Sequence, residues 1–129
     1  MGVTLYERLG GYDAIAAVAK NLVERLQKDS RLAKFWAHRG KDGIARELQL
    51  LIDYLCESAG GPLYYTGRDM KRVHAGMGLN QEDWLALRKH LENTLDEFSV
   101  PATERQDVLN FIETLKDDIV DSQVVGMAG

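Results

Sequence analysis

Apolar residues recur at three- and four-residue intervals through most of this 129-residue chain, and no segment keeps the two-residue alternation of a β-strand. The clearest run consists of Ile15, Val18, Ala19, Leu22, Val23 and Leu26. Glycine and proline stand between such runs, where they mark helix ends. The pattern predicts an all-α protein.

The ends of several helices can be placed from local signals. Thr4 and Glu7 have the spacing of a capping box, and Gly10 ends the short helix that they open. Asp13 is the expected cap of the next helix, and Pro101 stands where the last helix begins. Two long helices are expected near the C-terminus, marked by Trp84, Leu87, Leu91 and Leu95 and by Val108, Phe111, Ile112, Leu115 and Ile119.

Composition limits the class of protein. The length suits one domain, residues 1–129, with a core over about 4–121 and a short C-terminal tail. No run of about 18 apolar residues and no export signal is present, so we expect a soluble, cytoplasmic protein without a membrane partner. Mixed charges with a net value of −4 argue against nucleic acid as a partner. The single cysteine, Cys56, excludes an internal disulfide and is expected to be an inert core thiol.

The helix expected over about 44–57 is apolar around most of its circumference. One stripe contains Ile44, Leu48, Leu51, Ile52 and Leu55, and a second contains Leu50 and Tyr54. Such a helix must be covered on two sides. The second cover is either another helix or a ligand, and periodicity alone leaves both open.

A long irregular connection, LYYTGRDMKRVHAGMGLN, follows this helix and contains one helical turn that starts near Asp69. Long irregular connections in small domains are usually functional or disordered. Tyr64, Tyr65, Met70 and Val73 argue against disorder, because side chains of these types are normally buried.

The chain has three histidines, and none has the spacing of a zinc site. His38 lies in a polar loop and is expected to be solvated, whereas His90 borders an apolar helix face and is expected to be half-buried and hydrogen-bonded. His74 ends the short helical turn beside Val73 and Met70 and faces a glycine-rich exit.

A haem iron needs a neutral imidazole, an apolar wall that excludes water, and cations at the edge for the propionates. The segment around His74 offers all three. Arg68, Lys71 and Arg72 could supply the cations, although each could equally be a solvated surface residue.

With these residues the sequence resembles the group I truncated haemoglobins of bacteria, cyanobacteria, algae and protozoa. The resemblance begins with TLYERLGG, continues through LAKFW and AGGPLYYTGRDMKRVHAGMGLN, and closes with the Trp84 helix and Val100-Pro101. It covers nearly the whole chain, and GGP, YTG, M, VH and G follow in the order and spacing of the family.

The resemblance implies a two-over-two helical sandwich around non-covalently bound haem b, iron protoporphyrin IX, with His74 as the iron ligand. Trp36 stands where a phenylalanine usually packs on the porphyrin. The other positions that it implies for haem binding are Phe35, Leu51, Leu55, Tyr65, Arg68, Met70, Arg72, Val73, Leu79, Trp84, Leu87, Phe111 and Ile112. For each apolar residue taken singly, core packing is the alternative.

The distal side departs from the family pattern. Many members carry a tyrosine and a glutamine that hydrogen-bond bound O₂, and the matching positions here are Val23 and Leu51. We therefore expect weaker or faster-dissociating O₂ binding than in tyrosine-bearing relatives.

Other distal positions bear on coordination of the iron. Glu47, at the gate, is expected to face solvent or a cation; alternatively it stays protonated and donates to the ligand, as Tyr54 could. Leu50 replaces the histidine or lysine that some relatives use as a sixth ligand, so five-coordinate ferrous iron is expected, unless the loop 37–43 brings His38 or Lys41 to the iron. The last helix lacks the histidine that attaches haem covalently in certain cyanobacterial members.

Three functions follow as hypotheses. The first is reversible binding of O₂, NO or CO, including oxygen transport, by a monomer or weak dimer. The second is NO dioxygenation, which needs a reductase to return the iron to the ferrous state. The third is a haem-free helical module whose apolar helix covers a partner protein.

Overall fold

The computed structural model describes residues 3–37 and 40–120, and within these ranges the chain is helical with no strand. The prediction of an all-α protein is confirmed. The elements are α1 (Leu5–Leu9), α2 (Gly11–Lys28), the 3₁₀ turn η1 (Ala33–Phe35), α3 (Lys41–Ser58), α4 (Met70–His74), α5 (Gln81–Glu97), α6 (Ala102–Glu113) and α7 (Lys116–Ile119).

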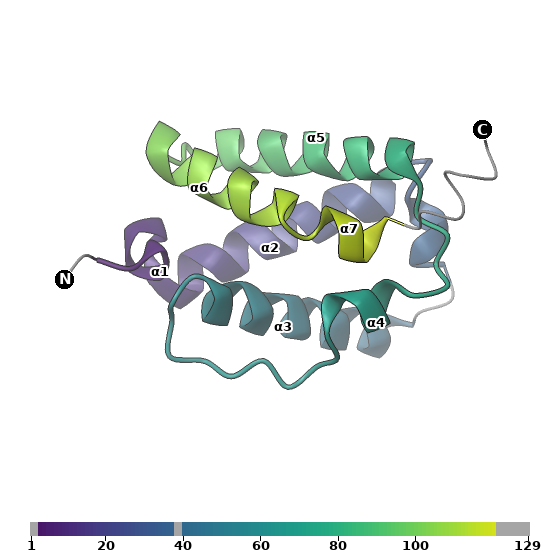
Figure 1. Ribbon diagram of the computed structural model, residues 1–129, viewed down its shortest axis with the longest axis horizontal. Helices are drawn as coiled ribbons and strands as arrows, with labels where there is room; N and C mark the ends of the chain where they lie inside the picture. Colours follow the sequence, from purple (N-terminus) through teal and green to yellow (C-terminus); the bar gives the residue numbers. More distant parts are fainter. Residues whose placement is uncertain (1–2, 38–39, 121–129) are drawn as a thin grey trace.

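The helices form two layers (Figure 1). Helices α5 and α6 lie side by side in the upper layer, α3 and α4 lie in the lower layer, and α2 runs behind and between them. Helix α2 packs against both α3 and α5, and α4 packs against α7. Because α2 contacts both layers, it connects them to each other.

Two buried clusters anchor α2. Ile15 and Ala19 of α2 pack with Ile52 and Cys56 of α3. The second cluster joins α2 to the other layer and consists of Leu22, Leu91, Leu95 and Leu109. Cys56 is fully buried, as predicted, and burial raises the pKa of its thiol.

Helix α1 begins and ends as predicted, but the start of α2 differs. The Thr4 hydroxyl accepts a hydrogen bond from the backbone N–H of Glu7 (3.1 Å), and Gly10 ends α1 with φ of 108°. The prediction that Asp13 caps α2 is wrong, because α2 begins at Gly11 and Asp13 lies in its first turn. Two successive glycines with positive φ let the chain turn directly from one helix into the next.

Two other boundaries differ from expectation. Helix α3 begins at Lys41, three residues before Ile44. The apolar pattern did not show this first turn, because its residues are polar or small and add nothing to the apolar stripe. The helix predicted through Val108 and Ile119 is interrupted after Glu113. There the Thr114 hydroxyl donates to the carbonyl of Phe111, a local bond that competes with helix continuation.

Gly61, which follows α3, lies against the ring of Tyr6. A Cβ atom at this position would come within 2.5 Å of Tyr6 Cδ2. We expect Gly61→Ala to lower the free energy of unfolding by about 1–3 kcal/mol, because the ring or the chain must shift. Urea denaturation measures this change. A Gly61→Ala variant with the urea midpoint of the wild type would contradict the prediction.

Candidate functional site

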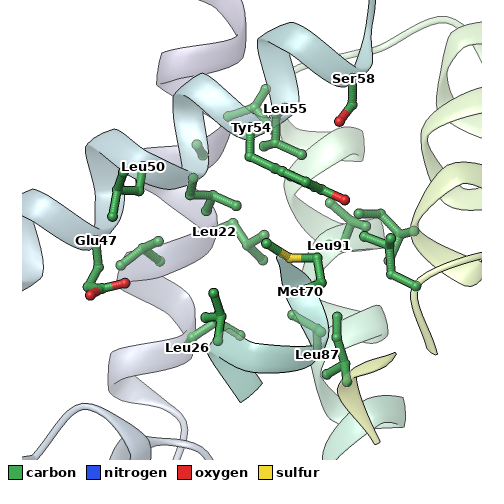
Figure 2. Close-up of a pocket in the computed structure, with 18 of the residues that line it drawn as sticks. Leu22, Leu26, Glu47, Leu50, Tyr54, Leu55, Ser58, Met70, Leu87 and Leu91 are labelled. Carbon is green, nitrogen blue, oxygen red and sulfur yellow. The ribbon is translucent and has the colours of Figure 1, made fainter. Parts of the chain in front are cut away.

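A cavity of about 880 Å³ lies between the two layers. This volume is within the range of sites for small molecules and cofactors. Figure 2 shows Tyr54 of α3 and Met70 of α4 projecting into the same space. The surrounding wall is mostly apolar and includes Leu22, Leu26, Leu50, Leu55, Leu87 and Leu91.

The structure brings nearly all of the predicted site residues to this cavity. Those on its lining are Val23, Phe35, Trp36, Glu47, Leu50, Leu51, Tyr54, Leu55, Tyr65, Arg68, Met70, Val73, His74, Leu79, Trp84, Leu87, Phe111 and Ile112. Arg72 is not among the lining residues; its side chain is 77% exposed and lies 3.9 Å from Asp69. The contacts of these residues with haem stay predictions.

Helix α4 positions His74. The Asp69 carboxylate accepts a hydrogen bond from the backbone N–H of Arg72 (2.8 Å) and so caps this five-residue helix. One turn later, His74 Nδ1 lies 2.8 Å from the carbonyl oxygen of Met70. A carbonyl can only accept, so Nδ1 carries the proton and Nε2 of the neutral ring is left with its lone pair.

The environment of His74 favours this neutral form. Burial lowers the pKa of His74, against the opposing effects of the Met70 carbonyl and the Glu47 carboxylate. Within the described ranges, Nε2 has no hydrogen-bond partner. A neutral imidazole with a free lone pair, half-buried at an apolar cavity, fits the ligand that a haem iron requires.

Carboxyl and phenol groups on α3 also line the cavity. Glu47 is half-buried and acts electrostatically on His74 and Tyr65. The Tyr54 ring packs edge-on against Tyr65, with centroids 5.1 Å apart, and burial raises the pKa of its hydroxyl. Tyr54 therefore stays a protonated phenol, able to donate a hydrogen bond, at neutral pH.

The connection between α3 and α4 is built around Tyr65. Its backbone N–H donates to the Glu57 carboxylate (2.6 Å), and its hydroxyl donates to the carbonyl of Arg68. A Cβ at Gly67 would collide with the Tyr65 ring, so glycine permits this close approach. The neighbouring Tyr64 is 87% exposed, and the expectation that it is buried was wrong.

The remaining histidines and the loop lysine are placed as follows. His90 is half-buried and hydrogen-bonds Asp29 through Nε2 (2.6 Å), as expected, although its buried Nδ1 has no partner in the part of the chain that the structure describes. Lys41 is exposed at the start of α3. His38 lies outside the described residues.

Sequence reasoning missed several wall residues. Leu22, Leu26 and Leu91 line the cavity but were assigned only to helix faces. On α2 the sequence pattern could have indicated two of them, since Leu22 and Leu26 belong to the same apolar stripe as Val23. The missing information was which part of that stripe faces a helix and which part faces a cavity.

A metal-binding cluster or a membrane span among the described residues would point to another class of site. These residues contain no group of three or more His, Cys, Asp or Glu side chains placed to hold a metal ion. No helix within 3–37 and 40–120 combines the length and apolarity of a membrane span.

An all-helical fold around an apolar cavity lined by His74 is the arrangement typical of the globin class. The sequence model of the family "Bacterial-like globin" matches residues 4–121. The chain is 34% identical over 117 residues to the group 1 truncated hemoglobin GlbN of Nostoc sp. (strain MUN 8820), covering 91% of this chain and 97% of that protein. It therefore belongs to the bacterial-like globins, and within them to the group 1 truncated haemoglobins, and is a haem-binding globin.

Solved structures agree with this fold. The truncated hemoglobin from Tetrahymena pyriformis in its Fe(III) form superposes with a TM-score of 0.83 at 27% identity, covering 92% of this chain and 98% of that chain. The 2/2 hemoglobin from Synechococcus sp. PCC 7002, with covalently attached heme, also superposes with a TM-score of 0.83 and the same two coverages. Its identity is 23%, so this likeness concerns the fold alone. The predicted two-over-two sandwich is confirmed.

Proposed function

We propose that this globin reversibly binds a diatomic gas (O₂, NO or CO) at a ferrous haem whose iron is ligated by His74. The observation that carries the proposal is the hydrogen bond from His74 Nδ1 to the Met70 carbonyl, because it leaves Nε2 unprotonated and able to bind an iron in the cavity that His74 lines. Haem b would supply an iron with one open coordination position for the gas. Arg68, on the cavity lining, is the cation proposed for a propionate.

The chain's own contribution is to exclude water and shape the gas site. Val23 and Leu51 line the cavity with apolar side chains, and the aromatic side chain of Trp36 lies on the same lining. Val23 and Leu51 offer no hydrogen bond to polarised O₂, which favours gas binding with fast O₂ release over sustained NO dioxygenation. Repeated use in either role would need a reductase for iron that has become ferric.

The test is the visible absorption spectrum of the haem-reconstituted ferrous protein before and after CO. We expect a five-coordinate spectrum that shifts fully with CO, since Leu50 occupies the position of a possible internal ligand. A six-coordinate spectrum without CO would contradict the open position and would direct attention to His38 or Lys41. Failure to take up haem would overturn the proposal altogether.

We also expect the haem to be held without a covalent bond. Helices α6 and α7 contain no histidine, and the only cysteine of the sequence is fully buried between α2 and α3. Acid butanone should therefore extract all of the haem, and mass spectrometry should then give the mass of the bare polypeptide. A polypeptide mass increased by that of haem would contradict this expectation.

A further inference from the structure

The turn between α2 and η1, residues 29–32, is fixed by the side chain of Asp29. We call this segment the α2–η1 corner. Asp29 Oδ1 accepts hydrogen bonds from the backbone N–H groups of Arg31 (2.6 Å) and Leu32 (3.2 Å). Asp29 Oδ2 lies 2.6 Å from Nε2 of His90, which comes from the middle of α5. One carboxylate thus shapes the corner and ties it to the other layer.

Arg31 makes a second connection from the corner to α5. Its guanidinium contacts Asp83 (3.2 Å) and Glu82 (2.9 Å) in the first turn of α5. The Asp83 side chain is 1% exposed and also closes the capping box with Asn80. The partner of Arg31 is therefore itself held in place.

The corner leads directly into the cavity wall. The Asp29 carbonyl accepts from the N–H of Ala33 (2.8 Å), and the Leu32 carbonyl accepts from that of Phe35 (3.1 Å). Leu32, Phe35 and Trp36 all line the cavity. Helix α5 contributes Trp84, Leu87 and Leu91 to the same lining. The two connections consequently join two walls of one cavity.

The presence of a histidine at position 90 is not explained by apolar packing. Its Nδ1 is buried without a hydrogen-bond partner among the described residues, which is unfavourable compared with an apolar side chain of similar size. The compensating interaction is the bond between Nε2 and Asp29, whose pKa is lowered chiefly by that same hydrogen bond. The imidazole is therefore suited to hold the corner.

We propose that His90 and Arg31 are positioning residues that hold Trp36 against the cavity wall and so keep the distal space open to the gas. The kinetic part of this inference rests on the proposed gas-binding function. Neither His90 nor Arg31 is among the residues that line the cavity, so any effect on the gas must pass through the α2–η1 corner. Loss of either connection should let the indole move into the distal space and slow the association of a gas.

The experiment compares variants of the haem-loaded protein by flash photolysis of the ferrous CO complex. His90→Leu removes the hydrogen bond, His90→Gln keeps a side-chain N–H donor, and Arg31→Met removes the second connection. Residues that act on a site through intervening contacts have modest effects. We therefore expect the CO association rate constant to fall by about two- to thirtyfold in His90→Leu and in Arg31→Met. His90→Gln should restore a rate close to that of the wild type.

The matched control is Arg105→Met. Arg105 pairs with Asp96 at 2.8 Å, a comparable link between α6 and α5 that does not involve the corner. The control should leave the CO association rate unchanged. Because the Arg31 side chain is 43% exposed, Arg31→Met is expected to fold even where a buried substitution at position 90 does not.

A second readout does not depend on gas binding. ¹⁹F NMR of the haem-loaded protein labelled with 5-fluorotryptophan gives one signal for Trp36 and one for Trp84, assigned with Trp36→Phe. In His90→Leu the Trp36 signal should shift or broaden while the Trp84 signal stays in place.

The two readouts separate the possible failures. An unchanged Trp36 signal in both His90→Leu and Arg31→Met would overturn the positioning role. A displaced Trp36 with an unchanged CO rate, or equal slowing in His90→Gln and His90→Leu, would overturn the role of the hydrogen bond in gas access. If the wild type binds haem but no CO, the proposed function fails, and the NMR measurement still decides whether the corner positions Trp36.

Discussion

A His74→Gly variant is expected to lose the five-coordinate ferrous spectrum of the reconstituted protein and to regain it when imidazole is added to the solution. Glycine removes the proposed iron ligand and should leave a space of imidazole size at the cavity that His74 lines. Loss of groups that only support a metal ligand typically costs 10- to 100-fold in affinity, so loss of the ligand itself should lower haem affinity by at least about a hundredfold. Haem titration followed by absorbance measures the affinity.

Imidazole rescue distinguishes ligation from a structural role. If His74 serves only to pack α4, added imidazole should not restore the spectrum, and the far-ultraviolet circular dichroism of the variant should show loss of helix. His74→Gly with native affinity and a native ferrous spectrum would show that another residue holds the iron. The His74 ligand would then be wrong, although the membership of the globin family would stand.

His74 could be proposed as the iron ligand from the sequence because it matches the histidine of the family pattern and because its immediate setting is local. The capping residue Asp69, the short helix and the bond between Nδ1 and the Met70 carbonyl all lie within six residues. Interactions at such short separations are determined by helix geometry, in which residues four apart are neighbours. The tertiary structure was needed only to show that the ring is half-buried at a cavity.

The two-sided apolar pattern of α3 was also informative, although periodicity could not say what covers each side. In the structure, Ile52 and Cys56 pack against α2 on one side. Leu50 and Tyr54 face the cavity on the other. Both alternatives that the pattern left open, a packed helix and a ligand space, are therefore present on different faces of one helix.

The surface cations and the interhelical polar contacts were beyond sequence reasoning. Long basic side chains on or just before a short helix can point toward a cavity or toward water. Arg72, on α4, is largely exposed, whereas Arg68, which precedes α4, lines the cavity. The contact of His90 with Asp29 joins residues 61 positions apart. Such a pair depends on how α2 and α5 cross, which no local pattern encodes.

Val23→Tyr is expected to slow O₂ dissociation from the ferrous protein by about ten- to a hundredfold. Val23 is 3% exposed on the cavity lining, and a phenol there could donate a hydrogen bond to polarised O₂. A bond to a charged acceptor is worth roughly 1.5–3 kcal/mol, and each 1.4 kcal/mol is about tenfold. CO is less polarised, so its dissociation should change much less. Stopped-flow displacement of each gas measures the two rates.

Val23→Phe is the matched control, because it adds the same ring without the hydroxyl. Its effect on O₂ dissociation reports steric crowding of the cavity alone, and the difference between the tyrosine and phenylalanine variants isolates the hydrogen bond. Similar O₂ off-rates in Val23→Tyr and wild type would mean that another donor already serves the gas, and Tyr54→Phe would then test the remaining phenol of α3. A slowing shared equally by Val23→Tyr and Val23→Phe would assign the effect to gas escape past a narrower wall.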